Sequence, residues 1–429
     1  MLLWLPVELP AQLEPAGTGG VVALEQALRH LGHAKRVLVI GAHPDDEDTE
    51  LLTLLTRSEG AEAAYLSLNR GEGGQNLIGA ELGERLGVLR TEELLAARRL
   101  DGAQQFFTRA YDFGFTRTLE DTWAHWPRDT LLADVVRVVR TFQPQVVVSV
   151  FSGTPRDGHG QHQAAGWLAR EAFRVAGDSN AFPDQLGPAG LAPWAPGKLY
   201  RSTRFDTAAT TLVLEGGRLD ALSGRTYHQV AMASRSLHRS QDMGQLQTIG
   251  PSPVRLELVE DRGGKGAASF WAGADTTLAG AGGKPDSKPG RQFAAYAEKV
   301  EKLRRSGREP TTAQLRELAV ALDKVRTAIA GETAGPRAAW LTALDSQRRW
   351  LAEAMQATAG VLVDVWADDS LAVPGATIGL AVDAHNTSAE PAEVRVALAG
   401  AVDDTTFAFT LAPGARASER VRMTVRASA

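Results

Sequence analysis

Hydrophobic positions in the first half of the chain follow two alternating patterns. Short runs at Arg36–Ile40, Ala64–Leu68 and Val146–Val150 are almost continuously apolar, as is typical of strands buried on both faces of a parallel sheet. Between them, Glu81–Leu100 and Leu131–Thr141 carry the 3.6-residue spacing of amphipathic helices. This alternation predicts an α/β fold with a Rossmann-like, mainly parallel sheet sandwiched by helices.

The second half of the chain changes character three times. Residues 261–291 are rich in Gly, Lys, Asp and Ser and predict a flexible loop or linker. Residues 292–359 have helical spacing with a break at Gly331–Pro336, which predicts a helical hairpin. Residues 360–429 alternate apolar and polar positions between turn signals, which predicts a small β-sandwich. A first domain is therefore expected over residues 1–260.

Composition narrows the classes of partner and of metal site. The net charge is −5 and the Lys and Arg residues are scattered, so nucleic acid is not an expected partner. Because the chain has no cysteine, any metal must be held by His, Asp or Glu. No apolar stretch reaches the roughly 20 residues of a transmembrane helix, and Met1–Val7 lacks the features of a signal peptide. The sequence predicts neither the localisation nor the oligomeric state.

A first polar motif, Ala42-His43-Pro44-Asp45-Asp46-Glu47, stands where the first strand gives way to a helix. Parallel sheets place ligands at this position, and His43 and Asp46, three residues apart, can face one point. The alternative is that the acidic residues only cap the helix and offset its dipole. Capping needs one or two acids and has no use for the His-Pro pair, so the motif favours a metal site.

A second polar motif, Asp157–His162, follows the strand that ends at Val150. An H-x-x-H pair is weak evidence alone and is often found on a surface. Here, however, both motifs follow the carboxyl ends of predicted parallel strands, and they can meet if those strands are neighbours. Two His and one carboxylate are the ligands of hydrolytic zinc, and iron, cobalt or manganese can also use them. A second carboxylate would remain as general base, and one His would remain for the developing charge.

Together the two motifs resemble the PIG-L (LmbE-like) family of zinc-dependent N-acetylglucosamine deacetylases, over roughly Leu24–Gly250. The resemblance implies a deacetylase domain over residues 1–260 that uses Zn²⁺ and removes an acetyl group from an N-acetylated sugar conjugate. It implies a small-molecule or glycan substrate and a metal-bound water activated by Asp45. The implied roles are metal ligation by His43, Asp46 and His162, general base catalysis by Asp45, electrostatic or acid assistance by His159, and sugar binding by Arg90 and Asp112.

One position departs from the family pattern. The family often has His-Pro-Asp-His where this chain has His159-Gly160-Gln161-His162, so neutral Gln161 replaces a carboxylate expected to tune the neighbouring His and the metal. Asp157 is a candidate substitute for that carboxylate.

Other features have two possible interpretations. Arg90 could form a helical ion pair with Glu93 instead of binding sugar. The Gly-rich stretch Arg70–Asn76 could border the site or be an ordinary loop, and Ser236–Gln241, with His238, could contact substrate or be a solvated helix face. The competing function is a non-catalytic carbohydrate-binding protein with a degenerate pocket.

Overall fold

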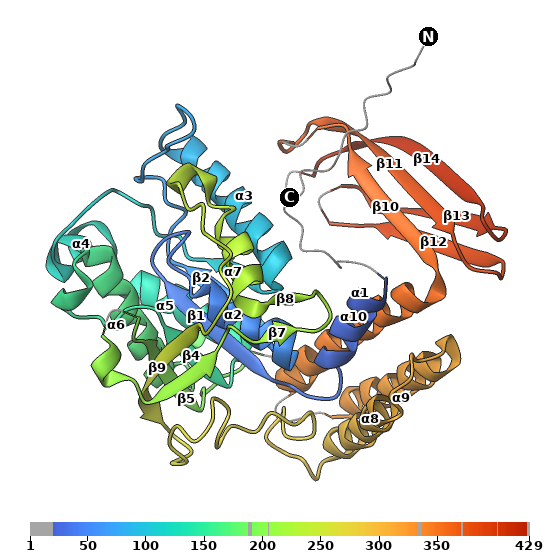
Figure 1. Ribbon diagram of the computed structural model, residues 1–429, viewed down its shortest axis with the longest axis horizontal. Helices are drawn as coiled ribbons and strands as arrows, with labels where there is room; N and C mark the ends of the chain where they lie inside the picture. Colours follow the sequence, from blue (N-terminus) through green and yellow to red (C-terminus); the bar gives the residue numbers. More distant parts are fainter. Residues whose placement is uncertain are drawn as a thin grey trace.

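A computed structural model of the chain describes residues 20–187, 191–204, 206–332, 337–369, 372–400 and 402–426. It is a mixed α/β protein with one large, mainly parallel sheet flanked by helices and two small antiparallel sheets toward the C-terminus (Figure 1). Within these ranges, no helix is both long enough and apolar enough to cross a membrane. The apolar start Met1–Val7 lies outside the described residues.

The large sheet has seven strands in the order β3-β2-β1-β4-β5-β9-β6. Its first five strands are parallel, whereas β9 runs antiparallel to both β5 and β6. The predicted strands at 36–40, 64–68 and 146–150 are confirmed, and they are three neighbouring strands of this sheet, the second to the fourth in its order. The bounds are β1 (Arg36–Gly41), β2 (Glu62–Ser67), β3 (Gln104–Phe107), β4 (Val146–Ser149), β5 (Lys198–Ser202), β6 (Leu212–Glu215) and β9 (Pro253–Asp261). A separate two-stranded pair consists of β7 (Leu219–Asp220) and β8 (Arg225–Thr226).

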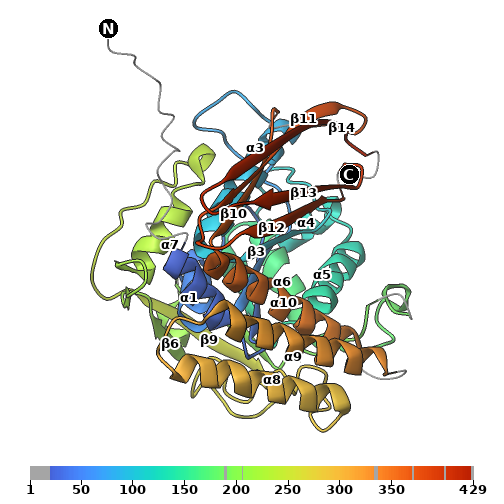
Figure 2. The same ribbon diagram turned by 90° about the vertical axis from the view of Figure 1, so that its right-hand side faces the viewer.

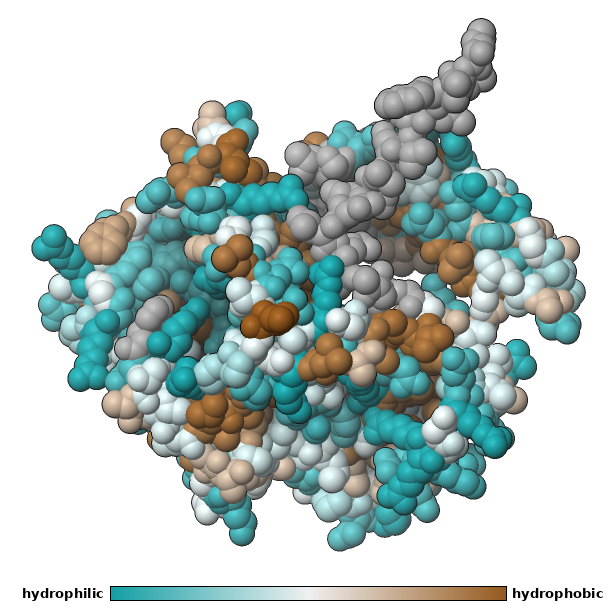
Figure 3. Space-filling view, viewed as in Figure 1, coloured by the Kyte–Doolittle hydropathy of each residue, from teal (hydrophilic) through white to brown (hydrophobic). Residues whose placement is uncertain are grey.

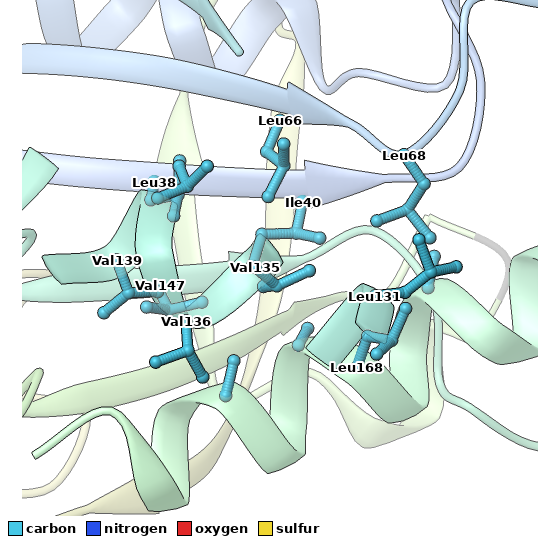
Figure 4. Close-up of a cluster of buried hydrophobic side chains, with 14 of the residues drawn as sticks. Leu38, Ile40, Leu66, Leu68, Leu131, Val135, Val136, Val139, Val147 and Leu168 are labelled. Carbon is cyan, nitrogen blue, oxygen red and sulfur yellow. The ribbon is translucent and has the colours of Figure 1, made fainter. Parts of the chain in front are cut away.

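Helices cover both faces of this sheet because its strands are apolar on both faces. Leu38 and Ile40 of β1 pack with side chains of α5 and α6 on one face (Figure 4). Val37 and Val39 pack on the opposite face with Leu51 and other residues that precede and follow β2. The helices are α2 (Thr49–Thr53), extended by a π-helical turn at Leu54–Ser58, α3 (Glu84–Asp101), α4 (Leu119–His125), α5 (Arg128–Phe142), α6 (Gly160–Val175) and α7 (Tyr227–Arg235).

A second hydrophobic core joins the N-terminal helix to the C-terminal helices. Leu28 of α1 (Gly20–His30) is buried in one cluster with Phe293 of α8 (Lys288–Arg305) and Trp340 of α10 (Arg337–Ala359). Leu278, from the segment 261–291, is buried in the same cluster. In the same segment, Phe270 stacks on Tyr200 with 5.3 Å between ring centroids. The expected boundaries at residues 260, 291 and 359 remain a prediction.

The predicted helical hairpin is wrong in its number of helices. Residues 288–359 contain three helices, because α9 (Thr312–Ala330) is separated from α8 as well as from α10. Gly307 has a φ of +61°, and Thr311 caps α9 through a bond to the Gln314 N–H. α9 ends at Ala330 and α10 begins at Arg337, and most of the expected break at Gly331–Pro336 lies outside the described residues. The apolar spacing continues through all three helices, which conceals the first break.

Residues 361–424 form two small antiparallel sheets, which lie to the right of the large sheet in Figure 1 and toward the viewer in Figure 2. One contains β10 (Val361–Ala367), β11 (Thr377–Asn386) and β14 (Arg416–Thr424), and the other contains β12 (Ala392–Leu398) and β13 (Thr405–Leu411). Val382 and Ala384 of the first sheet share a buried cluster with Phe409 and Leu411 of the second. The alternation predicted for this region therefore corresponds to strands with one more sheltered face, which is buried in parts of β11 and β13.

Candidate metal centre

The two polar motifs meet because their strands are direct neighbours. β1 and β4 pair in parallel, with Ile40 opposite Ser149, so their carboxyl ends lie at the same edge of the sheet. The chain then turns from β1 through residues 42–48 into α2, which Asp48 caps with a bond to the Leu51 N–H. From β4 it passes through a short 3₁₀ turn, Pro155–Asp157, into α6, which His159 precedes. The predicted convergence of the two motifs is thus present in the structure.

His43, Asp46 and His162 form a group that could hold a metal ion, which we call the metal group. One ligand atom from each lies within 4.8 Å of the others. His43 Nδ1 is 3.2 Å from Asp46 Oδ2 and 3.2 Å from His162 Nε2, which is itself 3.6 Å from Asp46 Oδ1. Asp46 Oδ2 also accepts the backbone N–H groups of Ala42 and His43, at 3.0 and 2.8 Å. Two imidazole nitrogens and a carboxylate anchored by its own loop suit a divalent transition metal.

The neighbouring side chains keep the Asp46 carboxyl in its charged form, which attracts cations. Although burial disfavours the charged form, His162 and His43 hold the pKa of the Asp46 carboxyl below its usual value. Burial would lower the pKa of His43, but the neighbouring Asp46 carboxylate raises it. Burial lowers the pKa of His162, so this imidazole is neutral and can offer a lone pair. Metal binding would therefore displace a proton that Asp46 stabilises on His43.

Gln161 fixes the orientation of His43. Its amide Nε2 donates to Asp112 Oδ1 at 3.1 Å and to Gly114 O at 2.9 Å, so its Oε1 must point the other way. That oxygen accepts from His43 Nε2 at 2.8 Å and from Asn69 Nδ2 at 2.9 Å. His43 must then carry a proton on Nε2, which leaves Nδ1 as the ring atom that faces Asp46 and His162.

Gln161 is therefore the side chain that accepts from His43 Nε2. The Asp157 carboxylate accepts the backbone N–H groups of Ser152 and Gly153 at 3.0 and 2.7 Å. Burial lowers the pKa of His162, and the charge of Asp157 opposes this shift. The substitution of Asp157 for the family's carboxylate stays a prediction.

Asp45 stands beside this group with a different set of contacts. Its carboxylate lies 3.3 Å from Arg90 NH2 and lines the same cleft as His43, Asp46 and His162. Burial raises the pKa of Asp45 to about 6, although Arg90 opposes the shift. Asp45 is thus a carboxyl group that can accept or release a proton near neutral pH.

The other predicted site residues line the cleft but have protein partners. Arg90 is 3% exposed and donates to Pro44 O and Gly71 O as well as pairing with Asp45. The alternative ion pair with Glu93 is not used, since Glu93 accepts the N–H and O–H of Ser240, each at 2.6 Å. Asp112 is buried against Gln161.

His159 lies next to the metal group, with its ring centroid 5.2 Å from that of His43. Burial, together with His43 and His162, lowers its pKa to about 4, so His159 is a neutral imidazole at pH 7. Its Nδ1 is 3.1 Å from Thr116 O, which leaves Nε2 for the cleft that His159 lines.

The cleft has a volume of about 1360 Å³, and its lining combines charged side chains with apolar ones such as Phe115 and Phe151. Opposite charges on its wall are paired, as in Arg201 with Glu257 at 2.7 Å and Arg156 with Asp206 at 3.2 Å. Gly73 and Gly74 also line it, so the stretch 70–76 does border the site. Figure 3 shows a mostly hydrophilic face with a brown group at the top, where the loop before α3 exposes Leu77, Ile78 and Leu82.

Sequence reasoning missed the role of His238. This side chain is fully buried, and its Nε2 lies 2.7 Å from Glu47 Oε1. It is therefore neither a solvated helix face nor a substrate contact. The two residues are 191 positions apart, and no local spacing in the sequence connects them.

Comparison with known proteins matches residues 38–173 to the PIG-L family, described as GlcNAc-PI de-N-acetylase. A 1D-myo-inositol 2-acetamido-2-deoxy-alpha-D-glucopyranoside deacetylase of Geodermatophilus obscurus is 33% identical over 184 residues, which are 39% of this chain and 60% of that protein. A diacetylchitobiose deacetylase of Thermococcus kodakarensis is 33% identical over 162 residues, 37% of this chain and 56% of that protein. The chain spans about 60% of the length of the first of these curated relatives.

Among solved structures, an N,N'-diacetylchitobiose deacetylase from Pyrococcus horikoshii in complex with an inhibitor is similar, at 21% identity and a TM-score of 0.38. The match covers 48% of this chain and 71% of that one. The motifs that form the metal group, around His43 and His162, both lie inside the matched span 38–173. Residues 38–173 of this chain form a PIG-L family domain.

Proposed function

We propose that the chain is a metal-dependent hydrolase that removes the acetyl group from an N-acetylated, GlcNAc-type sugar conjugate. The matched relatives are named as deacetylases of such sugars, which supports the substrate class. The observation that carries the proposal is the position of Asp45. It is a second carboxylate, distinct from the three residues of the metal group, and it faces the same cleft.

The residues present fit a divalent metal. His43 Nδ1 is presented by the Gln161 contact at Nε2, and His162 Nε2 and the Asp46 carboxylate face it. We propose zinc, for which two His and one carboxylate are a common set of protein ligands in hydrolytic sites. When bound, such a metal supplies a Lewis acid for the amide carbonyl and lowers the pKa of a water molecule.

The chain's own residues would divide the remaining work. Asp45, with its pKa near 6, takes a proton from the attacking water as the new C–O bond forms, and it can later pass that proton to the departing amine. Arg90 holds the Asp45 carboxylate in place. His159 offers Nε2 beside the reacting carbonyl. The C–N bond breaks, and the products are acetate and a free sugar amine.

We assign binding of the sugar to this cleft, whose lining offers both charged and aromatic side chains. Arg90 and Asp112 line it, and we propose that they contact sugar hydroxyls with the hydrogen-bonding capacity that their protein partners leave. The strand order β3-β2-β1-β4-β5 supports a Rossmann-like interpretation of the large sheet. The cluster shared by the two C-terminal sheets supports a small β-sandwich.

The test is an acetate-release screen over N-acetylated mono- and disaccharides and their conjugates, combined with metal analysis of the purified full chain. The proposal predicts about one divalent metal per chain and acetate release that chelation abolishes. A protein that contains no metal and releases no acetate, yet binds these sugars, would contradict it and favour the non-catalytic alternative.

A further inference from the structure

The backbone of Asp45 has an unusual conformation. Its φ is 108°, whereas the three other non-glycine residues with positive φ in the described ranges, Gln143, Phe182 and Asp242, have values between 51° and 58°. Those three are close to the left-handed helical minimum, which Asn, Asp and a few other residues can adopt, and Asp45 is well outside it. A conformation of this kind persists only where surrounding contacts hold it, and it is most often found at functional sites.

This conformation separates the directions of two adjacent aspartates. Asp46 turns back to accept the N–H groups of Ala42 and His43 and to join the metal group. The Asp45 carboxylate instead extends to Arg90. Neighbouring carboxylates can thus serve different partners only while the backbone between them is held in this unusual turn.

Glu47 supplies the contact that holds the turn. Its Oε2 accepts the backbone N–H of Asp45 at 2.9 Å. Glu47 is fully buried, and its other oxygen, Oε1, accepts from His238 Nε2 at 2.7 Å and from Arg98 NH2 at 3.1 Å. One oxygen of the Glu47 carboxylate is therefore fixed by the buried side chains of His238 and Arg98. The other oxygen accepts the backbone N–H of Asp45.

The partners of Glu47 are themselves rigidly placed. Arg98 belongs to α3 and pairs with Asp101 at 2.6 Å. His238 lies in the segment Ser236–Gln241, which is attached to α3 through the two bonds from Ser240 to Glu93. The Nδ1 atom of His238 is buried without a hydrogen-bond partner, so within the described residues the hydrogen bond of this imidazole is the one from Nε2 to Glu47.

We propose that Glu47 is a positioning residue for the reaction: its carboxylate, held by His238 and Arg98, keeps the backbone of Asp45 in the turn that directs Asp45 into the cleft. The catalytic consequence rests on the proposed deacetylase function. The role also gives a purpose to the segment 236–241, because its His238 completes the support of Glu47 from a distance of 191 residues.

The first experiment compares two buried carboxylates in the full-length protein, only one of which belongs to this network. Glu47→Gln keeps the shape but leaves one acceptor where two are needed. Asp220→Asn is the matched control, because Asp220 is equally buried and also pairs with arginines, but these are Arg57 at 3.4 Å and Arg29 at 3.6 Å, outside the contacts of Glu47.

Two readouts are needed, kcat for acetate release and hydrogen exchange of the Asp45 amide by ¹⁵N-Asp NMR. For Glu47→Gln we expect kcat to fall ~10–100-fold, the loss typical of a misplaced catalytic group, with KM within about threefold. The Asp45 amide should lose protection, while the Kd for added Zn²⁺ changes little. For Asp220→Asn, kcat and Asp45 protection should stay near wild type. Equal losses of kcat in both variants, or unchanged Asp45 protection in Glu47→Gln, would overturn the proposal.

A second pair keeps the test decisive if Glu47→Gln does not fold. His238→Gln can still donate to Glu47, whereas His238→Ala cannot. We expect kcat and Asp45 protection to be retained in His238→Gln and reduced in His238→Ala. If His238→Ala retains both, the support by His238 is refuted. If the wild-type protein releases no acetate from any N-acetyl sugar, the proposed function fails, but Asp45 amide exchange still decides whether Glu47 holds the turn.

Discussion

Replacing Gln161 by Met tests how the neutral amide supports the metal group. Met has nearly the same length, so the change removes polar contacts without opening a large cavity. Gln161 is fully buried, and its side chain makes four hydrogen bonds, to His43, Asn69, Asp112 and Gly114. The variant leaves each of these partners without its bond.

The expected loss of stability follows from the four hydrogen bonds that Gln161→Met removes. A buried polar group that loses its partner costs ~1–3 kcal/mol, and partial relaxation makes the total smaller than a plain sum. We therefore expect the free energy of unfolding of the metal-free protein to fall by about 3–5 kcal/mol. Since Gln161 no longer holds the proton on His43 Nε2, the affinity for Zn²⁺ should fall ~10–100-fold, as for other contacts that orient a metal-ligating His.

The assay is competition of the metal-free protein with a chromophoric chelator for Zn²⁺, with urea unfolding measured in parallel. The matched control is Gln163→Met, because Gln163 is buried on the same helix and its Nε2 donates to Arg117 O at 2.9 Å. This control should lose about 1–2 kcal/mol of stability and retain its Kd for Zn²⁺. If Gln161→Met binds Zn²⁺ as tightly as Gln163→Met, Gln161 does not orient His43.

Three further outcomes are expected. Asp45→Asn should lower kcat by ~10²–10⁴-fold, the typical contribution of a general base, with its metal content unchanged by elemental analysis; full activity would show that another group is the base. Chelation should lower the thermal unfolding midpoint, and Zn²⁺ at ~100 times its Kd should restore about 2.7 kcal/mol of stability in calorimetry; an unchanged midpoint would contradict the metal group. Burial would raise the pKa of Glu62, but Arg349, which bonds it at 2.6 Å, holds that pKa at about 2. Because this pKa is depressed in the folded state, the stabilisation is present above the unfolded value near 4.5 and is lost as pH falls toward 2. Glu62→Gln should therefore cost about 2 kcal/mol at pH 7, after allowance for the half-exposed Arg349, and progressively less between pH 4.5 and 3 in urea titrations; a constant difference would refute the assignment.

The metal group could be predicted from the sequence because its information is local. His43 and Asp46 share one motif, His162 belongs to another, and each motif directly follows a strand whose apolar run is easy to recognise. Only the adjacency of β1 and β4 had to be assumed, and the pairing of Ile40 with Ser149 confirms it.

The supports of this group were not predictable in the same way. The bonds from Gln161 to Asp112 and from His238 to Glu47 join residues 49 and 191 positions apart. Side chains at such separations meet only through the complete fold, and a single sequence has no periodicity that records the meeting. The break at Gly307 was missed for a different reason, since apolar spacing continues on both sides of it.

The second hydrophobic core has a consequence for dissecting the protein. α1 leads directly into β1, the strand that carries His43, yet its apolar face is covered by α8 and α10. Arg36 at the start of β1 donates to Thr342 O at 2.8 Å, and Glu62 of β2 is bonded by Arg349 and Ser346. A chain shortened after β9 would therefore keep every residue of the metal group but uncover the base of the strands that present it. We expect such a fragment to be aggregation-prone. The C-terminal helices therefore stabilise the sheet that carries the metal group and should be kept in any shortened version of the protein.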